Sequence, residues 1–205
     1  MSHARDAEIH HLIGGALCLD FANTLYGHGD APIHEYLRDY IDLALWSRHA
    51  GILEEQKAQL LIQEAGKNEA VAEAVFQQAI ALRETIFRLF ADVAQARTLS
   101  ANDLDQVHTA WKEALSHSNL VQTSGSFRLD WQDETALDGM LWRISDSAVG
   151  LLTSEAVGRV KQCSGCDWLF VDHSRNHRRR WCSMDQCGNR SKMRRRYQRE
   201  KAQIS

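Results

Sequence analysis

The sequence has a single proline in 205 residues and no long hydrophobic run. A helix that crosses a bilayer needs about 18 or more consecutive apolar residues, so we expect no membrane-spanning segment. The scarcity of proline and the absence of low-complexity stretches argue against disordered linkers. Residues 1–6 lack the basic start of a signal peptide, and no apolar middle or cleavage site follows them. We therefore expect a cytoplasmic protein without a membrane partner.

The sequence also lacks the common catalytic motifs. It contains no phosphate-binding loop, nucleophile elbow, metalloprotease histidine pair or dinucleotide-binding fingerprint. Its ten histidines are scattered, without a pairing that would indicate acid–base catalysis. We therefore expect a binding protein rather than an enzyme.

The net charge of −3 conceals a strong difference between the two ends of the chain. Residues 159–205 hold 13 lysine and arginine side chains against four acidic ones, whereas residues 1–158 hold 11 against 23. The C-terminal segment is therefore strongly cationic and the remainder is acidic. Such an asymmetry indicates a polyanionic partner for the basic end. The alternative is a basic tail that docks on its own acidic domain.

Residues 1–157 are predicted to form one mainly helical domain. Apolar residues recur at helical spacing over five segments: residues 37–45, 54–65, 68–97, 104–115 and 137–157. Pro32 suits a first helical turn, Gly51 a helix end, and Asn68 and Ser100 suit N-caps. Residues 127–131 alternate between apolar and polar side chains, which predicts a strand paired with residues 120–123. The apolar run at residues 16–21 is predicted to be a further strand against that hairpin.

Four of the five cysteines lie close together in the basic segment, in two pairs: Cys163, Cys166, Cys182 and Cys187. Two close pairs separated by roughly 15–20 residues are typical of a structural zinc site. Four thiolates complete the tetrahedron that zinc prefers and leave no open position for chemistry. An iron–sulfur cluster and four free buried cysteines are the alternatives. His173 and His177 are then turn residues or phosphate neighbours rather than ligands.

Residues 158–205 are predicted to form a small treble-clef-like zinc finger around one structural zinc ion. The predicted order is a cysteine knuckle, a hairpin of residues 169–171 and 178–182, and a helix from residue 188 to about 201. A segment of about 45 residues rarely folds on its own apolar burial. Zinc binding contributes roughly 10–16 kcal/mol in finger peptides and would supply the difference. The fold class is thus α+β, mainly α.

The predicted hairpin and helix carry the candidate DNA-binding residues: Arg175, Arg178, Arg179, Arg180, Asn189, Arg190, Lys192, Arg194, Arg195, Arg196 and Arg199. Guanidinium groups match phosphate oxygens and guanine edges bidentately. We expect the helix to lie in a groove of duplex DNA while the hairpin arginines contact phosphates. Met193 and Tyr197 form a narrow apolar stripe, predicted to pack against Phe170 or Trp181. The alternative is a solvated charged helix.

The tail resembles the CGNR zinc-finger family. Residues 187–190 read CGNR, and the flanking stretches WLFVDHSRN and RRWCSM are similar to that family, except that His173 stands where a threonine is usual. Residues 15–24, GALCLDFANT, resemble the opening of the ABATE domain, the usual N-terminal partner of this finger. The resemblance covers nearly the whole chain. It implies a bacterial, stress-induced transcriptional regulator whose finger binds DNA.

The N-terminal half leaves several roles open. Asp20, Asn23 and Thr24 are either polar walls of a small-molecule effector pocket or side chains that bond nearby backbone. Cys18 is expected to be a small buried apolar residue. Four tryptophans are expected in the core: Trp46, Trp111, Trp131 and Trp142. A homodimer is also left open.

Other functions compete with DNA binding for the same basic tail. An RNA-binding module, a protein-interaction module and a zinc–thiolate redox sensor are the alternatives. The tail has no clear aromatic stacking platform, which argues against single-stranded nucleic acid.

Overall fold

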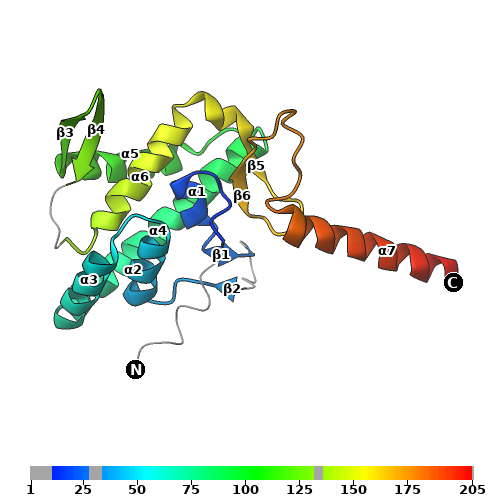
Figure 1. Ribbon diagram of the computed structural model, residues 1–205, viewed down its shortest axis with the longest axis horizontal. Helices are drawn as coiled ribbons and strands as arrows, with labels where there is room; N and C mark the ends of the chain where they lie inside the picture. Colours follow the sequence, from blue (N-terminus) through cyan, green and yellow to red (C-terminus); the bar gives the residue numbers. More distant parts are fainter. Residues whose placement is uncertain (1–10, 28–33, 132–135, 205) are drawn as a thin grey trace.

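The structure, a computed structural model, describes residues 11–27, 34–131 and 136–204, apart from the side chains of residues 195, 199, 200 and 202–204. Figure 1 shows a helical body from which the C-terminal helix α7 (Asn189–Ile204) projects. In these ranges no helix combines the length and the apolar character needed to span a bilayer. The predicted helical position of Pro32 lies outside the described residues.

Helix α4 (Glu69–Ala94) is the centre of the N-terminal core. Its buried side chains step by three or four residues through Val75, Ala79, Leu82, Ile86 and Leu89, as an amphipathic helix requires. This stripe lets α4 contact four other helices at once: α1 (Leu17–Ala22), α2 (Tyr40–His49), α3 (Glu55–Lys67) and α5 (Ala101–Ser116).

Three of the helix ends predicted from capping residues are found at the predicted positions. The Ser100 hydroxyl accepts a 3.3 Å hydrogen bond from the Asp103 backbone N–H and caps α5. Gly51 follows α2 with φ of 73°, a conformation that glycine adopts at low cost. Asn68 precedes α4, but its backbone carbonyl, rather than its side chain, accepts hydrogen bonds from the first turn. The predicted N-cap position at Asn68 is therefore confirmed, although its side chain makes no capping hydrogen bond.

The predicted hairpin is present as β3 (Ser118–Thr123) and β4 (Ser126–Trp131), and helix α6 (Gly139–Leu152) follows it. The hairpin stands away from the body in Figure 1, and its Leu120 and Phe127 side chains are largely exposed. Trp131 at its base and Trp111 on α5 are therefore only half-buried, against the expectation of a core position. Trp46 and Trp142 are buried, as predicted.

The segment predicted as a strand at residues 16–21 is the short helix α1. Its middle is buried on every side, so a continuous apolar run could not distinguish strand from helix. The Asp20 carboxylate accepts a 2.7 Å hydrogen bond from the Gly14 N–H and fixes the entry into this helix. Two short paired strands follow, β1 (Leu25–Tyr26) and β2 (His34–Glu35). The buried Arg83 guanidinium on α4 holds β2 through two 2.7 Å bonds to the Glu35 carboxylate.

The C-terminal part begins after a 3₁₀ turn, η2 (Glu155–Arg159), which contains the predicted domain boundary at residue 157. Strand β5 (Val160–Gln162) pairs antiparallel with β6 (Leu169–Val171), and the two strands flank the first cysteine pair. A π-helical turn, η3 (Met184–Gly188), precedes α7.

The predicted pairing of residues 169–171 with residues 178–182 was wrong, because residues 178–182 form a loop. The carboxylate of the buried Asp172 organises this loop. It accepts bonds from the Lys161 ammonium at 2.7 Å and from the Arg179 backbone N–H at 2.9 Å. Burial opposes the charge of Asp172, but the bonds from Lys161, Ser174 and Arg179 outweigh burial and lower its pKa below the ordinary range. Sequence reasoning missed Lys161 and Asp172 because their contacts form through an irregular loop, where no regular spacing indicates a partner.

Candidate metal centre and basic surface

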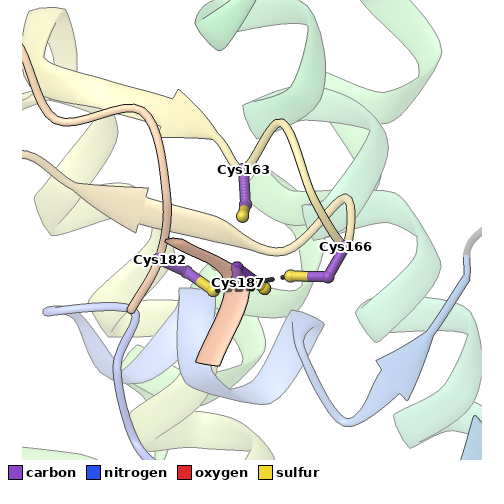
Figure 2. Close-up of side chains that lie close together, drawn as sticks. All are labelled: Cys163, Cys166, Cys182 and Cys187. Carbon is purple, nitrogen blue, oxygen red and sulfur yellow. Dashed lines mark hydrogen bonds between the residues drawn. The ribbon is translucent and has the colours of Figure 1, made fainter. Parts of the chain in front are cut away.

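The four predicted cysteine ligands meet in one cluster. Their Sγ atoms all lie within 4.8 Å of one another, and Figure 2 shows them converging from the β5–β6 connection, the following loop and the turn before α7. The Sγ atom of Cys182 is 3.4 Å from that of Cys166 and 3.7 Å from that of Cys187. No disulfide joins them. Four sulfurs at about 2.3 Å from one tetrahedral zinc ion would lie about 3.8 Å apart, so the cluster has the right size.

The cysteine cluster is shielded from water. All four cysteines are buried, and Trp168, Phe170 and the half-buried Trp181 pack around them. Removal of water strengthens the attraction between thiolates and a cation. The environment therefore suits a closed structural site.

The knuckle between Cys163 and Cys166 is shaped by close backbone approach. The Cys163 N–H donates to the Trp168 carbonyl at 2.8 Å, and the Gly165 N–H donates to the Cys163 sulfur at 3.4 Å. A Cβ atom at Gly165 would lie 3.2 Å from the Cβ of Cys187. Glycine therefore allows the knuckle to approach the turn that carries the fourth ligand.

The thiols cannot all ionise by themselves. Hydrogen bonds from Cys166 and Cys182 lower the pKa of Cys163, whereas the same contacts raise the pKa values of Cys166 and Cys182. Four thiolates at these separations repel one another, so they need a divalent cation between them. The donor set of four soft sulfurs fits zinc.

The finger is bound to the N-terminal half by the free edge of strand β6. The Asn23 side chain reproduces the pairing of a neighbouring strand: its amide N–H donates to the Leu169 carbonyl at 2.9 Å, and its carbonyl accepts from the Leu169 N–H at 2.8 Å. The Val171 N–H donates to the Gly14 carbonyl at 2.8 Å on the same edge. The Trp168 indole N–H adds a 3.1 Å bond to the Leu25 carbonyl.

These contacts resolve the roles that the sequence left open in residues 20–24. Asp20 and Thr24 bond nearby backbone, since Thr24 donates to the Phe21 carbonyl at 2.7 Å. Asn23 instead reaches 146 residues along the chain. Cys18 is fully buried, as predicted. Sequence spacing offers no signal for the long-range partner of Asn23.

The candidate basic residues divide into two groups. In the loop, Arg179 is part of the framework: its guanidinium lies 4.7 Å from the centre of the Phe170 ring and donates to the carbonyls of Trp181 and Cys182. The neighbouring loop arginines are exposed: Arg175, Arg178 and Arg180. The structure thus leaves three of the four loop arginines presenting their charge to solvent.

Helix α7 presents the second group. Its exposed basic side chains are Arg190, Lys192, Arg194 and Arg196, whereas the side chains of Arg195 and Arg199 lie outside the described set. Asn189 donates to the Asp185 carbonyl at 3.2 Å and closes the preceding turn. Met193 and Tyr197 are each 67% exposed, so the prediction that they pack on Phe170 or Trp181 was wrong. The helix projects from the body after its first turns (Figure 1), and both side chains therefore remain exposed to solvent.

The fold and the four-cysteine cluster define a helical protein with a C-terminal structural zinc finger. In a comparison with protein families, each of the two parts matches a known family. Residues 15–155 match the ABATE family, whose description reads "Putative stress-induced transcription regulator", and residues 159–200 match the CGNR zinc finger. The chain belongs to the ABATE family and carries the CGNR finger, which confirms the architecture predicted from the motifs. A search of curated proteins gave no match.

Proposed function

We propose that this protein is a transcription regulator that binds duplex DNA through its zinc finger. The observation that carries the proposal is helix α7, which projects from the body (Figure 1) and whose described arginine and lysine side chains are exposed. An α-helix fits the major groove of B-DNA, and guanidinium groups contact both phosphates and guanine edges. Arg175, Arg178 and Arg180 on the adjoining loop supply further phosphate contacts.

The zinc ion supports this function by holding the finger together. Cys163, Cys166 and Cys182 tie the β5–β6 unit to the loop, and Cys187 ties the same ion to the turn before α7. One ion thus fixes the loop arginines relative to the helix. The zinc ion takes no part in chemistry, and the protein acts by binding rather than by catalysis.

The acidic N-terminal half is the regulatory part of the proposal. Its net negative charge repels the DNA backbone, so only the finger is attractive to a polyanion. The contacts of Asn23 and Gly14 with strand β6 connect the two parts directly. A small-molecule effector, or a second copy of the chain, would act on the finger through this junction. The cytoplasm of a bacterium is the setting in which we place this activity.

The salt dependence of binding tests the proposal. With about six phosphate contacts, log affinity for a labelled duplex should fall against log salt with a slope near −5. Removing one phosphate contact by Arg194→Ala should reduce the slope by about 0.9. Arg128→Ala is the matched control, because Arg128 is a partly exposed arginine on the distant β3–β4 hairpin. A flat salt response of the zinc-loaded protein would refute DNA binding.

Two further measurements separate the alternatives. Structured RNA that displaces duplex DNA at equal concentration would identify an RNA-binding module instead. Selection of bound sequences from a random duplex pool, with and without a chelator, should return a metal-dependent consensus. Equal recovery of all sequences would show that the protein binds DNA only non-specifically.

A further inference from the structure

A surface pocket lies where the N-terminal half meets the finger. It has a volume of about 100 Å³ and is lined by Tyr26 and Tyr36 from the N-terminal half and by Trp168, Gln186 and Arg190 from the finger. Cys166 and Cys187 also line the pocket, whereas Cys163 and Cys182 do not. The pocket therefore adjoins the metal cluster without coinciding with it. Its volume is below the roughly 300–1,000 Å³ typical of sites for drug-sized ligands, so it admits only a small ligand.

Three aromatic rings form the walls of this pocket. The centroid of the buried Trp168 indole is 6.3 Å from that of Tyr26 and 6.5 Å from that of Tyr36, with interplanar angles of 76° and 56°. Both tyrosine rings are inclined to the indole, so neither is stacked face to face on it. Tyr26 and Tyr36 belong to the N-terminal half, so the whole chain has aromatic surface for stacking that the basic tail alone lacks.

Arg190 and Tyr26 provide the pocket with hydrogen-bond donors. The Arg190 guanidinium donates to the Tyr26 hydroxyl oxygen at 3.0 Å, and that hydroxyl keeps its own proton to donate. A guanidinium carries five N–H groups in a fixed plane, of which this bond uses one. The pocket therefore favours a planar ligand with an acceptor such as a ring carbonyl or a ring nitrogen.

Charges of both signs border the pocket, so neither an anionic nor a cationic ligand meets a uniformly complementary surface. A zinc ion with four thiolates carries a formal charge of −2, and two of those sulfurs belong to the lining residues Cys166 and Cys187. These thiolates repel an anion and attract a cation, whereas Arg190 does the reverse. A neutral ring with acceptor atoms meets neither penalty.

We propose that this pocket binds one uncharged nucleobase-like ring. The ring stacks against the half-buried Tyr26 or Tyr36 and accepts a hydrogen bond from Arg190. The same chemistry has two sources: a free base or nucleoside that acts as an effector, and an unpaired base in a nucleic acid held by α7. The second source rests on the proposed DNA-binding function, whereas the first does not.

Calorimetric titration of the full-length, zinc-loaded protein with neutral nucleosides tests the free source. Stacking of a base on an aromatic side chain contributes about 1–3 kcal/mol, so Tyr36→Leu should weaken nucleoside binding about 5- to 150-fold. Tyr36→Phe keeps the ring and should bind within about twofold of the unmodified protein. Phe127→Leu, an aromatic loss on the distant hairpin, is the matched control. Zinc content and circular dichroism establish that each variant is folded.

Oligonucleotides test the second source. A duplex with one unpaired base is compared with the same duplex carrying an abasic position there. A preference for the base that Tyr36→Leu abolishes supports the proposal, as does nucleoside binding that the same variant loses.

Two results separate failure of the pocket from failure of the proposed function, and a third tests the charge of the ligand. If no nucleoside binds and base and abasic duplexes bind equally, the pocket proposal is wrong although DNA binding stands. If nucleosides bind and no DNA does, the pocket proposal stands and the proposed function is wrong. Binding of benzoate as tight as that of nucleosides would overturn the selection for an uncharged ring.

Discussion

Replacing Asn23 by alanine should separate the zinc finger from the N-terminal half without touching a metal ligand. Asn23 is fully buried, and its side chain satisfies both backbone groups of Leu169, which is itself fully buried. Asn23→Ala therefore leaves one N–H donor and one carbonyl acceptor without partners. Each such buried group costs about 1–3 kcal/mol, so we expect a loss of about 2–6 kcal/mol in the free energy of unfolding.

Denaturant unfolding of the zinc-loaded protein measures this loss as a change in the midpoint concentration. Hydrogen exchange gives the location: the Leu169 and Val171 amides should lose protection, whereas the amides in the middle of α4 should keep most of theirs. Asn119→Ala is the matched control, because Asn119 is an exposed asparagine on strand β3. A loss below about 1 kcal/mol, or unchanged protection of Leu169, would refute the assignment of Asn23 as the link.

Two other predictions concern the metal and the pH. Cys182→Ser should abolish stoichiometric zinc binding, measured by elemental analysis, and should disorder the loop and α7 while α4 stays folded; a fully ordered finger without zinc would contradict the site. Burial raises the pKa of Asp20 to about 6 from 3.8, so the folded state binds this proton more tightly than the unfolded state does. The stability contributed by Asp20 should thus fall by about 3 kcal/mol as the pH rises from about 4 to about 6. Asp20→Asn keeps an oxygen for the Gly14 N–H and does not titrate, so its stability relative to the unmodified protein should rise over that interval; a constant difference would show that Asp20 does not titrate there.

The helices and the metal site could be predicted because their signals are local. The stripe of α4 repeats every three or four residues from Val75 to Leu89, and a repeat of this length has few structural alternatives. The cysteines could be predicted because a tetrahedral ion restricts the spacing of its ligands. In both cases the constraint can be read from a single stretch of sequence.

The errors arose where a distant partner decided the structure. Residues 16–21 form a helix because α4, α6 and β6 surround them, and the local pattern fits a strand equally well. Strand β6 pairs with β5, and Lys161 and Asp172 bind the backbone of Arg179 in the loop of residues 178–182, contacts that no local pattern indicates. The pocket beside the finger combines Tyr26 and Tyr36 with Trp168, more than 130 residues later in the chain. No spacing rule predicts such a combination.

The way in which Asn23 and Gly14 cover strand β6 limits how the finger can be used elsewhere. If residues 158–205 were transplanted to another protein, the Leu169 and Val171 backbone groups would lose their partners, and Trp168 would lose the Leu25 carbonyl. An uncovered strand edge invites pairing with other chains. The finger should therefore not be transferable without the segment that covers it. A fusion of the finger that retains residues 14–25 should remain soluble, whereas a fusion without them should aggregate.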